Sequence, residues 1–405
     1  METKKEGFPA AFWVCACTEI FERLAYYLGR SLILIFVTAS VATGGLGLSD
    51  TVAANMQSNL TAFSYLLPLF GAVIVDKYIG ARYTTPVGMF IAAAGYFTGG
   101  IAKSSAGVYA MIFLVSLGLA LFKNGAIIGR VITDKSQMDP AFSMRYTLVN
   151  VGAFIGTFLV GILYKDVFAK DGVLGFAPCF KMAALMMVLG GLWYIFVCWR
   201  FLGDLGKLPF KKTLTEEEKA AEAKKKEETG TKQPLTTIEK KRIGAIFVAS
   251  LFSIVFWIFW YLGYMPVYFY WAENMDWVVA GYQVPSTWFD AANSLFCVIL
   301  GPVTAALWKK LAARPQGDMS LFRKTGLGIA IIGVGYLFYA AIDIMRGGEK
   351  ASVLWLIVFA FLLTMGEMFF SPLGHSFISK YSPSRYLAVM MSVWGFATFI
   401  AAKSY

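Results

Sequence analysis

Apolar segments long enough to cross a lipid bilayer recur along almost the whole chain, and they constrain the fold more than any other feature. A membrane-spanning helix needs about 20 mostly apolar residues. Segments that meet this requirement are 10–40, 51–76, 84–102, 107–131, 146–164, 177–202, 243–271, 285–308, 325–345, 352–379 and 387–405. Hydrophobic residues make up 58% of the chain and charged residues only 15%, against about half and a quarter in soluble domains. The sequence therefore predicts an all-α polytopic membrane protein with eleven visible spans.

One long polar segment divides these spans into two blocks. It contains the run TEEEKAAEAKKKEETGTK, which is rich in Lys and Glu and cannot cross a membrane. We therefore expect an N-terminal six-helix bundle at 1–202, a charged cytoplasmic linker at 203–242 and a C-terminal bundle at 243–405. Two bundles of six spans are the plan of transporters built from parallel halves. A twelfth span would have to follow Tyr405, so we expect a truncated or unusually short form.

Basic residues lie mainly on one side of the predicted membrane. The linker and the 309–314 loop are basic, whereas the loops at 41–50 and 272–284 contain no Lys or Arg. Basic loops stay on the cytoplasmic side, so we expect a multi-pass protein of the plasma or inner membrane with a cytoplasmic N-terminus. This distribution accounts for the net charge of +11, and we expect the lipid bilayer rather than a nucleic acid as partner.

The first predicted span carries a polar stripe that lipid would not tolerate. At helical periodicity, the stretch EIFERLAYYLGR places six polar side chains within one arc of about 140°: Glu19, Glu22, Arg23, Tyr26, Tyr27 and Arg30. A single charge at the centre of an isolated span costs about 2.5–3.5 kcal/mol. The stripe must therefore face protein or a water-filled cavity, where its acids and bases can pair at i, i+3 or i+4 spacing. An ion-paired helix contact with no role in transport is the alternative.

Four further polar residues lie within predicted spans: Lys123, Asn150, Asn293 and Glu367. Each alone could be a structural polar group. Taken together, the first block offers the cations Arg30 and Lys123, and the second block offers the anion Glu367. Opposite charges of this kind suit a zwitterion, whose carboxylate and amine need opposite partners.

Several separated motifs, in order along the chain, resemble those of the proton-dependent oligopeptide transporters (POT/PTR family) of the major facilitator superfamily. EIFERLAYYLGR is similar to the signature E-x-x-E-R-F-x-Y-Y, with Leu24 where Phe is usual. LFKNGAIIGR resembles the fourth-span F-K-P-N stretch, with Asn124 where Pro is usual. GAVIVDKYIGARYT, YTLVNVGAFIG, PSTWFDAANSLFCVILGPVTAALW, GEMFFSPLGHSFISKYSPSRY and AVMMSVWGFAT resemble other family segments. The resemblance implies the two-bundle major facilitator fold and import of di- and tripeptides with protons by alternating access.

The resemblance also implies a role for individual residues. The peptide carboxylate would be held by Arg30 and Lys123. The peptide amino terminus would be held by Asn150, Asn293 and Glu367. The cavity would be lined by Tyr26, Tyr27, Trp288, Ser371 and Trp394. The proton would be carried or tuned by Glu19, Glu22 and Arg23, and the loop motif that stabilises one closed face would be Asp76, Gly80 and Arg82.

The seventh span departs from the family pattern. The family usually reads F-W-x-x-[FY]-E-Q, whereas this chain reads FWIFWYL, with Tyr261 in place of the acid and Leu262 in place of Gln. A tyrosine, with a reference pKa of about 10, carries no charge near neutral pH. We therefore assign coupling to Glu22 with Glu19, a pair that we expect to lie beside Arg23 and Lys123. The alternatives are a same-family transporter of another small substrate or without proton coupling, and a non-transporting membrane sensor.

The sequence contains no P-loop, metal-ligand cluster or Ser–His–Asp pattern. We therefore expect no enzyme activity, no cofactor and no metal. His375 is the single histidine and is expected near the cytoplasmic end of its helix. The five cysteines lie in or beside apolar spans and are expected to act as small apolar side chains. We expect a monomer whose substrates are small peptides and protons.

Overall fold

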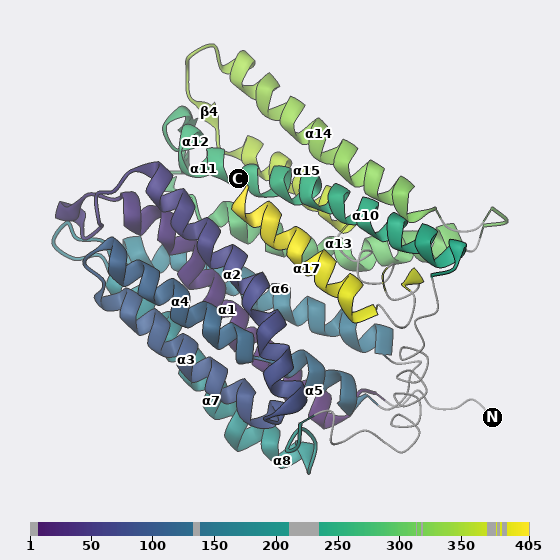
Figure 1. The fold of residues 1–405 in the computed structure, drawn as a ribbon. Helices are drawn as coiled ribbons and strands as arrows, with labels where there is room; N and C mark the ends of the chain where they lie inside the picture. The colour runs from purple at the N-terminus through teal and green to yellow at the C-terminus, as the bar shows by residue number, and fades with distance from the viewer. Residues whose placement is uncertain are drawn as a thin grey trace. The chain divides into compact units, whose positions relative to one another are not determined.

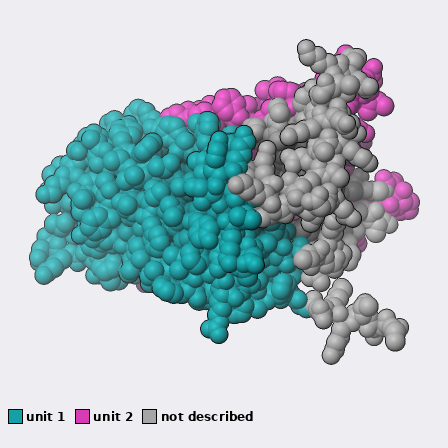
Figure 2. Space-filling model, turned by 60° about the horizontal axis from the view of Figure 1, so that its bottom comes forward, with its two compact units in different colours: residues 1–213 teal, residues 214–405 magenta. Residues whose placement is uncertain are grey.

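The structure is a computed structural model that describes residues 7–132, 138–209, 235–312, 314–316, 319–370, 378, 381–382 and 387–404. The chain divides into two compact units, Met1–Thr213 and Leu214–Tyr405. Figure 1 shows the helices of both units, and Figure 2 colours unit 1 teal and unit 2 magenta. Each unit is described by itself below.

Unit 1 consists of helices joined by loops in its described part, with one isolated β-bridge between Lys170 and Val173. Its α-helices are α1 (Ala10–Thr38), α2 (Asp50–Lys77), α3 (Ala81–Ile101), α4 (Ser105–Leu121), α5 (Asn124–Val131), α6 (Met138–Ile162), α7 (Phe176–Trp193) and α8 (Trp199–Leu202). A short 3₁₀ turn lies at Val41–Thr43, and π-helical turns lie at Leu163–Val167 and Tyr194–Cys198. Helix α1 packs against α6 and α7, and α3 packs against α4 and α7. The first helix is thus enclosed by its own bundle, which allows it to carry buried charges.

Small residues let α6 approach α1 closely. A Cβ atom added at Gly152 would lie 2.8 Å from the backbone oxygen of Ile20, and one added at Gly156 would lie 2.5 Å from that of Leu24. Glycines four residues apart on one helix face allow two backbones to touch in this way. The close packing brings side chains at the start of α6 to the polar stripe of α1.

Unit 2 consists of helices with a few very short strands. Its α-helices are α10 (Thr237–Leu262), α11 (Met265–Tyr268), α12 (Tyr270–Asn274), α13 (Trp288–Ala312), α14 (Leu321–Arg346), α15 (Leu354–Met368) and α17 (Leu387–Lys403). The strands are β1 (Met275–Asp276), β2 (Val278–Val279), β3 (Tyr282–Gln283) and β4 (Ala351–Ser352). β1 pairs with β4 in parallel, and β2 pairs with β3 in an antiparallel hairpin. α10 packs against α17, and α15 packs against α13 and α14.

Each predicted span coincides with one or more of these helices, and two differences from the expectation bear on the argument below. The fourth span is two helices, because Phe122 and Lys123 leave the helical conformation between α4 and α5. The seventh span begins at Thr237 rather than at 243, inside the predicted linker. Its start is set by Thr236, whose side chain forms a capping box with Glu239.

The helices are suited to a membrane. Within the described residues, six stretches are long and apolar enough to span one: Asp50–Val75, Ser105–Val131, Met144–Val167, Phe176–Leu202, Thr237–Tyr268 and Phe322–Arg346. Large apolar side chains such as Phe196, Leu337 and Ile344 point outward and are at least 70% exposed. Surfaces of this kind are stable in lipid but not in water. The chain is thus an integral membrane protein of all-α class, and the number of its spans remains a prediction.

Two residues of the predicted loop motif join the start of α3 to the end of α8. The Arg82 guanidinium donates to the backbone oxygens of Gly203 and, at 3.1 Å, Trp199, and it lies over the Trp199 ring at 5.0 Å. A Cβ atom added at Gly80 would lie 2.1 Å from the backbone oxygen of Gly206. Arg82 and Gly80 therefore hold the beginning of the linker region against unit 1. The Asp76 side chain lies outside the described part of the chain.

Gly80→Ala is expected to lower the stability of unit 1 by about 1–3 kcal/mol, the usual cost of forcing extra atoms into a packed contact. The thermal unfolding midpoint of the detergent-solubilised protein measures this. Gly244→Ala is the matched control, since nothing lies within 4 Å of a Cβ atom added there. An equal midpoint for the Gly80 and Gly244 variants would contradict the close contact.

Candidate substrate and proton site

The polar stripe of α1 forms a continuous row of contacts. The carboxylate of Glu22 accepts two hydrogen bonds from the neighbouring Arg23, one of them from an Nη at 2.8 Å. The Arg23 guanidinium also lies over the Tyr26 ring, 5.1 Å from its centre. Glu22 is fully buried, whereas the Arg23 side chain is 27% exposed. This pair joins the predicted proton group directly to a predicted cavity residue.

The stripe continues towards the C-terminus of α1. The Tyr26 and Tyr27 rings meet edge to face at 5.4 Å. The Arg30 guanidinium lies 6.0 Å from the centre of the Tyr27 ring, and Arg30 is 6% exposed. The row from Glu22 to Arg30 is therefore connected through aromatic faces, which attract the guanidinium groups.

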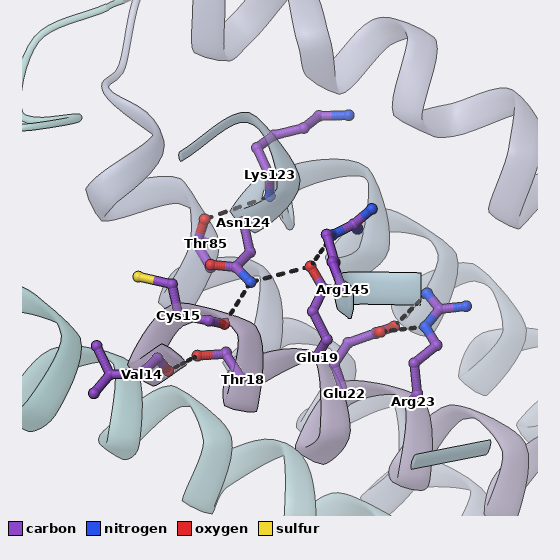
Figure 3. A network of polar contacts seen from close by, with 10 residues as sticks. All are labelled: Val14, Cys15, Thr18, Glu19, Glu22, Arg23, Thr85, Lys123, Asn124 and Arg145. Carbon is purple, nitrogen blue, oxygen red and sulfur yellow. Dashed lines mark hydrogen bonds and ion pairs between the residues drawn. The ribbon is translucent and has the colours of Figure 1, made fainter. Parts of the chain in front are cut away.

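Glu19 has partners on two other helices (Figure 3). The Arg145 Nε on α6 donates to Glu19 Oε1 at 2.9 Å. The Asn124 side-chain amide on α5 donates to the same oxygen at 3.0 Å and to the backbone oxygen of Cys15 at 2.8 Å. Glu19 and Asn124 are both almost completely buried. This arrangement satisfies a buried carboxylate with one cation and one neutral donor.

The pairing differs from the pattern expected from helix spacing. We expected charges of α1 to pair at i, i+3 or i+4, but Glu22 pairs with the adjacent Arg23 and Glu19 pairs across to α6. We also expected Lys123 beside the two acids. Its ammonium group instead donates to the backbone oxygen of Pro68 at 2.8 Å, and Figure 3 shows its side chain directed away from Glu19. Arg145 is the cation at Glu19.

The break between α4 and α5 explains where Lys123 and Asn124 lie. Lys123 has φ −123° and ψ 30°, outside the helical region. Its backbone amide donates to the Thr85 hydroxyl of α3 at 3.4 Å. Broken helices are tolerated at membrane depth where the freed groups are buried in protein. The break turns the amide of Asn124 towards α1.

Asn150 lies on α6 and is 9% exposed. Its side-chain amide donates to the backbone oxygen of Tyr146, one turn earlier, at 3.0 Å. Asn150 thus shares a helix with Arg145, and its amide hydrogen bond lies within that helix.

The second unit holds a separate polar cluster around Glu367 on α15. The Asn293 side-chain amide on α13 donates to Glu367 Oε2 at 3.1 Å and to the Thr364 hydroxyl at 2.8 Å. The Cys297 thiol lies 3.9 Å from the same carboxylate oxygen. All four side chains are buried. The structure therefore brings together Asn293 and Glu367, which the sequence placed in different spans.

The remaining predicted site residues of unit 2 lie in aromatic contacts. Trp288 meets Tyr282 at 5.8 Å, and Trp394 stacks on Phe370 at 5.8 Å. Tyr261, which stands where the family has an acid, is 4% exposed and lies 5.9 Å from Trp257. Ser371 and His375 fall outside the described residues.

Sequence reasoning missed two residues of the site, Arg145 and Asn124. Arg145 lies one residue before the motif YTLVNVGAFIG and just outside the predicted span 146–164, so a charge adjoining that span was the available signal. Asn124 was noticed only as a departure from the family proline. The described residues contain no group of three or more His, Cys, Asp or Glu that could hold a metal ion.

Comparisons with known proteins agree with this architecture. The model of the POT family matches residues 205–404. An uncharacterized transporter of Bacillus subtilis, YclF, is 25% identical over 98% of this chain and 87% of its own. A di-/tripeptide transporter of Lactococcus lactis subsp. cremoris is 24% identical over 96% of this chain and 86% of its own.

Solved structures extend the likeness to three dimensions. The crystal structure of a peptide transporter POT in complex with sulfate is 24% identical and superposes with a TM-score of 0.84, covering 99% of this chain and 89% of its own. A POT family transporter in complex with 5-aminolevulinic acid gives the same TM-score over 98% of this chain and 90% of its own. The fold is therefore the two-bundle major facilitator fold predicted from the sequence. The family model over residues 205–404 and the relatives along almost the whole chain therefore agree in making this protein similar to the POT family of transporters.

Proposed function

We propose that this protein imports di- and tripeptides together with protons by alternating access. The observation that carries the proposal is the pair of buried carboxylates on α1, where Glu22 pairs with Arg23 of the same helix and Glu19 pairs with Arg145 of α6. Buried charges are costly in a membrane protein and mark substrate or proton paths. The di-/tripeptide transporters among the relatives support the choice of substrate. A non-transporting sensor would not need these buried charges.

The peptide-binding roles follow the chemistry of each unit. Arg30 is a buried cation at the end of the α1 row and suits the peptide carboxylate, with Lys123 as the second cation. Glu367 is a buried acid that holds Asn293, and together they suit the peptide amine. The aromatic residues Tyr26 and Tyr27 would line the path. The proposed site is completed by Asn150, Trp288, Ser371 and Trp394.

The same observations support a proposal for the location and domain organisation of the protein. The protein acts as a monomeric transporter rather than an enzyme, in the plasma or inner membrane, with its N-terminus in the cytoplasm. The charged segment 203–242 links the bundles at 1–202 and 243–405 on the cytoplasmic side, and α10 begins within it at Thr237. Asp76, Gly80 and Arg82 form the loop motif that stabilises one face of the closed bundle.

Uptake of a labelled dipeptide into proteoliposomes, with and without an inward pH gradient, tests the function directly. We expect accumulation only with the gradient. Accumulation that ignores the gradient would favour the alternative, a same-family transporter without proton coupling. No dipeptide uptake under either condition would reject peptide import.

A dipeptide amide tests the role of the cations. The amide lacks the carboxylate, so Arg30 and Lys123 have no anion to bind. A charged hydrogen bond contributes about 1.5–3 kcal/mol. We therefore expect the amide to compete at least about tenfold more weakly than the free dipeptide. Arg30→Ala should abolish dipeptide uptake in protein that still reaches the membrane. Equal competition by amide and free dipeptide would reject the assignment.

A further inference from the structure

A buried acid near the N-terminal end of α13 takes no part in the site described above. Asp290 is the third residue of α13 and is 5% exposed. The Tyr268 hydroxyl, at the last residue of α11, donates to Asp290 Oδ2 at 2.9 Å. An acid buried in a membrane protein is rare and functional by default. We therefore expect Asp290 to have a function separate from the site above.

The position of Asp290 connects it to the Glu367 cluster. Asp290, Asn293 and Cys297 are spaced i, i+3 and i+7, so they lie on one face of α13. Two of them, Asn293 and Cys297, contact the Glu367 carboxylate. Ser294, one turn after Asp290, is also buried. One polar face thus runs from Asp290 to the second buried acid of the unit.

Tyr268 connects Asp290 to the seventh span. The segment from α10 to α11 is short, and Tyr261 and Tyr268 are seven residues apart on it. Tyr261 stands where the family acid is expected, so that span lacks its usual proton-binding group. A hydrogen bond from Tyr268 brings a different acid to the end of the same span.

The other charged groups on the elements around Asp290 either have hydrogen-bond partners or are exposed. Glu367 on α15 holds Asn293. Asp343 and Arg346 on α14 bond to each other, and Arg346 also donates to the Tyr270 hydroxyl of α12. Glu273 on α12 and Asp276 on β1 are exposed at the surface. Asp290 and Glu367 are the two carboxyl groups buried within the described part of unit 2.

We propose that Asp290, together with the Tyr268 hydroxyl, is a second proton-binding site that serves in place of the acid absent at Tyr261. The inference rests on the proposed proton-coupled uptake. With Asp290 charged, the Tyr268 hydroxyl donates to it. When Asp290 takes up a proton on its other oxygen, Oδ2 becomes a neutral and weaker acceptor, so the hydrogen bond from Tyr268 loses its charge-assisted strength. Proton binding therefore alters the contact between α13 and the end of the seventh span.

Asp290→Asn tests the proposal, because it keeps the size of the side chain and removes the titrating group. In proteoliposomes we expect gradient-driven dipeptide accumulation to fall about fifty-fold, the factor that one proton supplies across a gradient equivalent to about 100 mV. Counterflow, which needs no net proton movement, should stay within about twofold. Tyr268→Phe should shift the pH of half-maximal uptake and keep transport. Glu273→Gln is the matched control, since that acid is exposed on α12, and it should behave as the parent protein.

A measurement without transport separates this proposal from the proposed function. Infrared difference spectra of the full chain between acid and neutral pH report protonated carboxyl groups. Asp290→Asn should remove one such signal and Glu273→Gln should not remove it. If the parent protein shows no gradient-driven uptake, the proposed function fails, and the infrared signal alone decides whether Asp290 binds a proton. Full accumulation by Asp290→Asn, or an unchanged carboxyl signal, would overturn the proposal.

Discussion

Glu22→Gln is expected to abolish gradient-driven peptide accumulation while leaving peptide counterflow. Protonation of Glu22 would release Arg23, which also lies over the Tyr26 ring, so proton binding reaches a cavity residue through one side chain. A glutamine keeps the shape but cannot carry a proton. One proton crossing a gradient equivalent to about 100 mV supplies about 2.3 kcal/mol, which corresponds to about fifty-fold accumulation. We expect Glu22→Gln to lose this whole fifty-fold accumulation.

The experiment compares uptake and counterflow in the same proteoliposomes. Glu349→Gln is a suitable control, because Glu349 is an exposed acid of unit 2. Glu367→Gln should weaken both uptake and counterflow, since it removes the proposed partner of the peptide amine. If Glu22→Gln still accumulates peptide in proportion to the imposed pH difference, the proton is carried elsewhere.

Arg145→Gln is expected to destabilise unit 1 by about 2–3 kcal/mol. It leaves the Glu19 carboxylate, which is 2% exposed, with Asn124 as its remaining hydrogen-bond donor among the described residues. Removing one partner of a fully buried ion pair costs about 3–5 kcal/mol. The Arg145 side chain is 30% exposed, and water that reaches it reduces the cost below that range. The thermal unfolding midpoint in detergent measures the change.

A double variant separates the ion pair from other effects of Arg145. Glu19→Gln together with Arg145→Gln removes both charges and keeps a side-chain oxygen that accepts from Asn124. We expect the double variant to recover more than half of the stability that Arg145→Gln loses, because two residues in contact have coupled effects on stability. Arg200→Gln, at an exposed position on α8, should stay within about 0.5 kcal/mol of the parent protein. A double variant no more stable than Arg145→Gln would show that Glu19 does not need the cation.

Local patterns in the sequence predicted the class and plan of this protein. The length of each apolar run predicts a spanning helix, because lipid leaves no water to satisfy an irregular backbone. Charges within the first span indicate an interior row, since lipid would not tolerate them. Helical periodicity predicted that the polar residues from Glu19 to Arg30 lie on one helix, and α1 contains them all.

The partners of those charges could not be read from the sequence. Spacing along a helix shows which residues share a face, but it does not show which neighbouring helix covers that face. Arg145 reaches Glu19 because Gly152 and Gly156 let α6 touch α1, and Asn124 reaches it because the chain leaves the helix at Lys123. The contact of Tyr268 with Asp290 depends in the same way on two separate segments meeting.

The sequence by itself determined the membrane class, the order of the helices and which residues carry charge inside them, because these depend on composition and short-range periodicity. Only the tertiary structure decided how the charges pair: Glu19 with Arg145 and Asn124, Glu22 with Arg23, and Glu367 with Asn293. The physical reason is that a buried charge is stabilised by whichever donor the packing of separate helices brings within hydrogen-bonding distance, and that packing depends on many residues at once.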